Sequence, residues 1–172
     1  MVLSNREKDL NRLQRLALEL SALDTKFIEA EQIVVGNWVR LKCQYGCDGY
    51  GRRLTCPPYS PSPEEMRRIL SDYTSALLIR VGPSRIGHKV AVKLEREAFL
   101  SGFYRAFALG EGPCPFCKEC NLQRCVKPEL ARPSMEACGI DVYATVRNAG
   151  YPIDVVKKQE EKPNFYSLLL LE

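Results

Sequence analysis

Residues 76–81 read Ala-Leu-Leu-Ile-Arg-Val, a short apolar run that Gly82 and Pro83 close. An apolar run of this length between turn residues is typical of a buried β-strand. Residues 165–171, Phe-Tyr-Ser-Leu-Leu-Leu-Leu, predict another strand near the end of the chain. Further strands are predicted at residues 27–35, 103–109 and 153–157. The aromatic-rich segment 103–109 also fits a continuation of the preceding helix, but Gly102 interrupts it and favours the strand.

Helices are predicted between these strands, where apolar residues recur at three- and four-residue intervals. Ser4 and Glu7, and again Ser62 and Glu65, have the spacing of a capping box at a helix N-terminus. Helices are expected over residues 5–22, 87–101 and 142–149, directly after Ser62, and as a short turn at 37–41.

The order of these elements predicts an α/β or α+β fold, with a small mixed sheet flanked by helices. The last two strands are expected to be antiparallel, because only a short segment connects them. The chain has 172 residues, 45% hydrophobic and 27% charged, which fits one domain over residues 1–172. Two cysteine-rich loops interrupt the same core, an upstream loop at residues 43–61 and a downstream loop at residues 110–133.

The net charge of +4 is lower than a nucleic-acid-binding domain usually carries, so no nucleic-acid partner is expected. No apolar run approaches the roughly 20 residues that cross a bilayer. The N-terminal residues lack the apolar stretch of a signal peptide. Together these features predict a cytoplasmic protein without a membrane span.

The unusual feature of the composition is eight cysteines beside a single histidine. Cytosolic proteins keep their thiols reduced, so clustered cysteines there more often bind metal or do redox chemistry than form disulfides. A centre built mainly from thiolates selects zinc, copper(I) or an iron–sulfur cluster.

The downstream loop carries the stronger pattern, Cys114-x2-Cys117-x2-Cys120-x4-Cys125. Bacterial ferredoxins bind four-iron clusters with Cys-x2-Cys-x2-Cys-x3-Cys-Pro. The run here has one more residue before its fourth cysteine, and its proline, Pro128, stands farther away. A structural zinc site usually pairs two nearby cysteines with two distant ligands, which leaves the third closely spaced cysteine unexplained. The spacing therefore favours a 4Fe-4S cluster, with zinc as the alternative.

The upstream loop carries a second pattern, Cys43-x3-Cys47-x8-Cys56, among several glycines. Glycines let backbone amides donate hydrogen bonds to cluster sulfurs and so tune the potential of a cluster. A structural zinc loop is again the alternative.

Eight thiolates suffice for two four-cysteine centres, and the upstream centre needs a fourth ligand. Cys138 could supply it, or Cys125 could cross over, as the fourth cysteine of a run does in two-cluster ferredoxins. A third alternative leaves one iron open to substrate as a Lewis acid. Cys138 is equally well explained as a small, buried core residue that binds no metal.

Four segments together resemble one prokaryotic family: Tyr45-Gly46-Cys47, residues 54–61, residues 112–120 and residues 132–142. It is the predicted metal-binding family known as domain of unknown function 2284, and the likeness spans about residues 25–172. The resemblance implies metal binding by three upstream and four downstream cysteines and supplies no reaction. Cys138 stands outside the family pattern, which puts its role as an eighth ligand in doubt.

Three hypotheses about function follow. The leading one is an iron–sulfur protein of the cytoplasm, with two 4Fe-4S clusters, that acts in electron transfer or redox maturation in an anaerobic setting and meets a redox partner protein. The second is an enzyme in which a small-molecule substrate binds an open iron, as in non-redox lyase or desulfuration chemistry. The third is a structural zinc module for protein interactions.

Two other features are interpreted as ordinary surface. His88 is expected to be exposed in the first turn of a helix, and Arg52-Arg53 and Arg67-Arg68 are expected to form a solvated basic face. A single histidine also makes a hydrolase triad hard to assemble.

Overall fold

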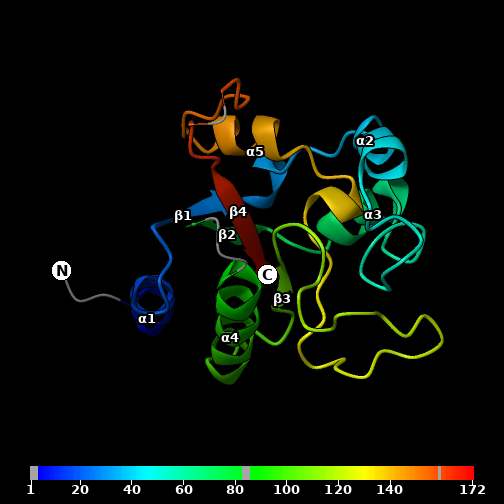
Figure 1. Cartoon of the computed structure of the whole chain (residues 1–172). Coiled ribbons are helices and arrows are strands. Elements are labelled where there is room, and N and C mark those ends of the chain that lie inside the picture. Colours follow the sequence, from blue (N-terminus) through cyan, green and yellow to red (C-terminus); the bar gives the residue numbers. More distant parts are fainter. Residues whose placement is uncertain (1–3, 83–85, 159) are drawn as a thin grey trace.

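The computed structural model describes residues 4–82, 86–158 and 160–172, so Pro83, which the sequence places after the strand 76–81, lies outside the described residues. Four strands form one sheet at the centre of the molecule (Figure 1). Their order is β1-β2-β4-β3, and each neighbouring pair is antiparallel. The strands are β1 (Asp24–Glu29), β2 (Ser75–Val81), β3 (Phe107–Leu109) and β4 (Phe165–Leu170).

Within the described part of the chain, five α-helices and two 3-10 helices surround this sheet. The α-helices are α1 (Asn5–Glu19), α2 (Val39–Gly46), α3 (Pro63–Leu70), α4 (Ile86–Leu100) and α5 (Val142–Asn148). The 3-10 helices are η1 (Ala30–Gln32) and η2 (Glu136–Cys138). The predicted combination of helices with a small sheet is confirmed.

The sheet is wholly antiparallel because its last strand enters its middle. β2 and β3 both pair with β4 in the antiparallel sense, so they run parallel to one another on either side of it. The predicted alternation of strand, helix and strand is therefore present from β2 through α4 to β3, but β4 separates the two parallel strands.

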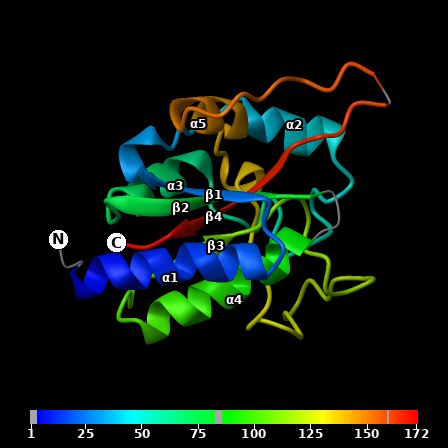
Figure 2. The same ribbon diagram turned by 90° about the vertical axis from the view of Figure 1, so that its left-hand side faces the viewer.

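The central strands are buried on both faces, as their near-continuous apolar sequences predict. Alternate residues of β2 and β4 point to opposite sides, since successive side chains of a strand alternate. Leu78 and Leu168 belong to one core, while Leu77 and Leu169 belong to the other. Figure 2 shows α1 and α4 on one side of the sheet and α2, α3 and α5 on the other.

Both predicted capping boxes are present. At the start of α3, the N–H of Glu65 donates to Ser62 Oγ at 3.2 Å and the N–H of Ser62 donates to Glu65 Oε2 at 2.7 Å. The same reciprocal pair joins Ser4 and Glu7 at the start of α1. Among the described residues, no helix combines the length and the apolar character that crossing a membrane requires.

Three predicted strands are wrong in extent. The strand expected at 27–35 ends at Glu29, because its ladder ends where Glu29 pairs with Ser75, the first residue of β2, and η1 follows. The strand expected at 103–109 is reduced to β3, since a turn joins the N–H of Ala106 to the carbonyl of Phe103. Residues 153–157 form no strand, because β2 and β3 already occupy both edges of β4.

Candidate metal centre

The upstream cysteines lie on a helix and on the turns that follow it. Cys43 is on α2, so the segment predicted to be a loop from residue 43 begins as helix. Cys47 follows the last residue of α2 and is exposed, whereas Cys56 is buried. The Cys43 thiol points to η2 and donates to the Glu136 carbonyl at 3.8 Å.

Gly49 brings two of these sulfurs together. Its N–H donates to Cys47 Sγ at 3.4 Å. A Cβ added at Gly49 would lie 3.1 Å from Cys56 Sγ and 3.5 Å from Cys47 Sγ. A side chain at this position would crowd the Cys56 sulfur, so glycine suits the close approach of the backbone, and the predicted amide-to-sulfur contact is present here.

The downstream cysteines surround one small hollow. The chain from residue 111 to residue 133 has no regular helix or strand, as predicted. Arg53, Leu54, Phe116 and Lys127 contribute to the same hollow. The cysteines that line it are all four of the run, Cys114, Cys117, Cys120 and Cys125.

The two loops are tied to one another by residues of the upstream loop. Arg53 Nη1 donates to the carbonyl oxygens of Cys114 at 2.9 Å and Cys117 at 3.2 Å. The N–H of Leu54 lies 3.5 Å from Cys120 Sγ and donates to it. The prediction that Arg53 is part of a solvated basic face is therefore wrong, because its guanidinium holds the backbone of the downstream run.

Arg40 has an equivalent role on the upstream side. Its guanidinium donates to Ser60 Oγ, to the Ser60 and Pro61 carbonyls and to the Ala137 carbonyl, at 3.1–3.3 Å. These bonds join the end of the upstream loop to η2. No local pattern in the sequence indicates a role for Arg40. Arg53, by contrast, stands directly before Leu54-Thr55-Cys56, and this position indicates a role near the cysteines.

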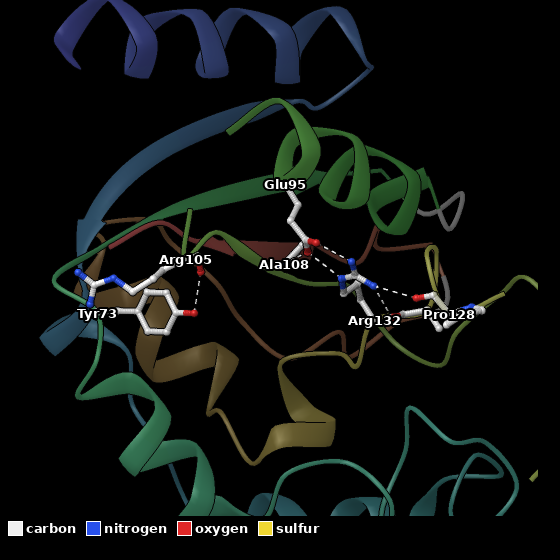
Figure 3. A network of polar contacts seen from close by, with 7 residues as sticks. Tyr73, Glu95, Arg105, Ala108, Pro128 and Arg132 are labelled. Carbon is white, nitrogen blue, oxygen red and sulfur yellow. Dashed lines mark hydrogen bonds and ion pairs between the residues drawn. The ribbon is translucent and has the colours of Figure 1, made fainter. Parts of the chain in front are cut away.

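The C-terminal end of the downstream loop is fixed by a carboxylate of α4 (Figure 3). Arg132 Nε donates to Glu95 Oε2 at 2.7 Å, and Arg132 Nη2 to Glu95 Oε1 at 2.5 Å. Glu95 Oε2 also accepts from the Ala108 N–H at 2.7 Å. Hydrogen bonds to this carboxylate raise the pKa of Arg132, so the guanidinium stays charged and joins α4, β3 and the loop.

His88 supports the other end of the same loop. It is fully buried, so the prediction of an exposed histidine is wrong: its face of α4 packs on the core. Nδ1 lies 3.5 Å from Glu111 Oε2, and the ring meets Phe116 edge-on at a centroid distance of 6.2 Å. A Cβ on Gly110 would lie 2.5 Å from His88 Nε2. His88 thus packs against the first part of the downstream loop, at Gly110, Glu111 and Phe116.

Cys138 lies in the core rather than on a loop. It ends η2 and has no exposed surface. Burial raises the pKa of its thiol to about 12. Burial likewise raises the pKa of Cys56 to about 11, and it raises the pKa of Cys43 and Cys114. These thiols are protonated at neutral pH without a metal, so ligation has to release their protons.

The side chains fit a thiolate-bound metal centre in chemical type. All the candidate ligands are cysteine sulfurs, and the absence of a side chain at Gly49 leaves space beside the Cys47 and Cys56 sulfurs. Within residues 4–82, 86–158 and 160–172, no three His, Cys, Asp or Glu side chains are grouped so that they could hold one metal ion. The four downstream cysteines instead line one hollow of about 20 Å³, which has room for about one water molecule.

No curated protein and no solved structure matches this chain. One family model, that of a predicted metal-binding protein (DUF2284), matches residues 26–171. The matched range contains both cysteine loops and every cysteine of the chain. It agrees with the resemblance that the cysteine motifs carry, and the chain belongs to the DUF2284 family of predicted metal-binding proteins.

Proposed function

We propose that this protein holds two 4Fe-4S clusters and transfers electrons in the cytoplasm to or from a redox partner protein. The observation that carries the proposal is the set of four downstream cysteines around one hollow. Four thiolates are the usual ligand set of a 4Fe-4S cluster, which supplies one-electron oxidation and reduction when bound. The downstream ligands would be Cys114, Cys117, Cys120 and Cys125, and the upstream ones Cys43, Cys47 and Cys56 with one more.

The contacts between the loops support a redox role. Leu54 donates its N–H to Cys120 Sγ and stands two residues before Cys56, so the two sites are neighbours in space. Hydrogen bonds to sulfur are among the means by which a protein sets the potential of a cluster. The bonds from Leu54 and Gly49 would act on the downstream and upstream sites respectively.

The second candidate function is an enzyme with one open iron at the upstream site. The positions of two cysteines favour it: Cys138 belongs to the hydrophobic core and Cys125 lines the downstream hollow. An upstream site without both of them has three cysteine ligands. An open iron binds exogenous ligands and acts as a Lewis acid.

Analysis of anaerobically purified protein for iron, acid-labile sulfide and zinc tests the proposal. Two filled sites give about eight iron and eight sulfide per chain. Cys117→Ala is expected to remove about four of each from the downstream site, and Cys47→Ala about four from the upstream site. Stoichiometric zinc without sulfide would refute the iron–sulfur assignment and favour the structural zinc module.

Cys138→Ser separates the two candidate functions. If Cys138 is a ligand, the variant has an altered or oxygen-labile upstream cluster. If both clusters keep their spectra, Cys138 is a core residue. In that case, binding of an exogenous ligand such as cyanide to the upstream cluster, seen as a spectral change, distinguishes an open iron from closure by Cys125.

A further inference from the structure

A cleft with a volume of about 490 Å³ lies between the two cysteine loops and the sheet. Small-molecule sites typically have about 300–1,000 Å³. Helix α3, strands β3 and β4 and both loops contribute to its walls. Its apolar lining includes Leu54, Met66, Ile69, Phe107, Leu109 and Leu170.

The chemistry of the lining selects a neutral occupant. Of the described residues that line the cleft, none is an Asp, Glu, Lys, Arg or His. The Ser60 hydroxyl donates to the Ala137 carbonyl at 2.6 Å, and the Tyr73 hydroxyl donates to the Arg105 carbonyl at 2.8 Å (Figure 3). Ser60 and Tyr73 are therefore already paired with the protein, whereas the buried Thr55 Oγ1 has no partner and can bond a polar group of a neutral ligand. A charged ligand would lose its hydration without meeting a charged partner.

The cleft shares a wall with the downstream cysteine site. Leu54, Thr55, Cys125 and Ala131 line both the cleft and the hollow that the four cysteines surround. A molecule in the cleft is therefore separated from that hollow by a single layer of side chains, one of them a predicted metal ligand. Cys138, which is buried in the core, also lines the cleft.

We propose that this cleft binds a neutral, mainly apolar small molecule beside the downstream cysteine site. The proposal that a molecule binds here rests only on the residues that line the cleft. The closeness of the bound molecule to a redox centre rests on the proposed function. The sequence did not indicate the cleft, because its walls come from segments that are distant along the chain.

Two probes with the same aromatic skeleton test the proposal, N-phenyl-1-naphthylamine, which is neutral, and its 8-sulfonate, which is an anion. Equilibrium dialysis against the anaerobically purified full chain avoids interference from any colour of the protein. One neutral probe per chain is expected, with the sulfonate at least about tenfold weaker, because no cationic side chain lines the cleft. Equal affinity for both probes, or no saturable binding of the neutral one, would overturn the proposal.

Ile69→Glu places a charge in the wall of the cleft and is expected to weaken the neutral probe at least about tenfold. Leu18→Glu is the matched control, because Leu18 is a part-exposed aliphatic residue of α1 that does not line the cleft. Ile69→Trp fills space without charge and should also weaken binding, which keeps the test valid if Ile69→Glu unfolds. Unchanged binding in a folded Ile69 variant contradicts the proposed position of the probe. Iron and sulfide, measured on the same samples, report separately on the proposed function.

Discussion

At the scale of single residues, the contact between Gly49 and two cysteine sulfurs makes the upstream site sensitive to one methyl group. A Cβ at Gly49 would lie 3.1 Å from Cys56 Sγ, closer than most Cβ atoms approach a neighbour. Gly49→Ala therefore has to displace Cys56 or the turn that holds it. We expect the variant to lose up to about four iron per chain, those of the upstream site, in metal analysis of anaerobic protein.

Gly46→Ala is the matched control for Gly49→Ala. Gly46 is the last residue of α2, and a Cβ there would meet nothing within 4 Å. Alanine also favours helix over glycine, so this variant should keep its metal and its stability. Full metal content in Gly49→Ala would show that Cys56 does not need its present position for ligation.

At the scale of elements, α3 shows how a short helix is stabilised by its first turn. It has eight residues, too few for an isolated helix to be stable in water, and its capping box satisfies two backbone N–H groups. Ser62→Ala removes the acceptor for the Glu65 N–H and should lower the free energy of unfolding by about 1 kcal/mol. Denaturant unfolding of the full chain measures this change.

Ser71→Ala at the other end of α3 provides a comparison. The Ser71 hydroxyl donates to the Arg68 carbonyl at 2.7 Å on the exposed surface, where water can replace the bond. We expect it to change the free energy of unfolding by less than about 0.5 kcal/mol. Equal effects of the two serine variants would contradict the assignment of a stabilising role to the cap.

At the scale of the whole molecule, the two cores are formed almost entirely without the cysteines. Among the described residues, Cys138 is the one cysteine that belongs to either core. The sheet and the helices α1 and α4 therefore have their packing independently of a metal, whereas the two cysteine loops contribute few apolar contacts. Ordering such loops depends on the free energy of metal binding.

Removal of metal with a chelator under reducing conditions should therefore loosen the loops and leave the sheet. Hydrogen exchange followed by mass spectrometry is expected to show lost protection over residues 43–61 and 110–133. Protection in β2 and β4 should persist, because both strands are buried on both faces. A far-UV circular dichroism spectrum that collapses on chelation would contradict this separation of core and loops.

Features that act over a few residues could be predicted from the sequence. The reciprocal caps of Ser4 and Ser62, the buried strands near 76–81 and 165–171 and the helix after Asp141 follow from local spacing, and all are present. The cysteine spacing likewise indicated metal binding, which the family supports.

Features that join distant segments could not be predicted, because they depend on how the chain packs in three dimensions. β4 enters between β2 and β3, which removes the strand expected at 153–157, because both edges of β4 are already paired. Arg53 donates to the carbonyls of Cys114 and Cys117, and His88 packs against Phe116 of the downstream loop. The residues that flank a charged or aromatic side chain in the sequence look the same whether that side chain is exposed or makes a buried contact. The partner that distinguishes these cases lies 28 to 64 residues away and is brought close only when the sheet and its two cores assemble.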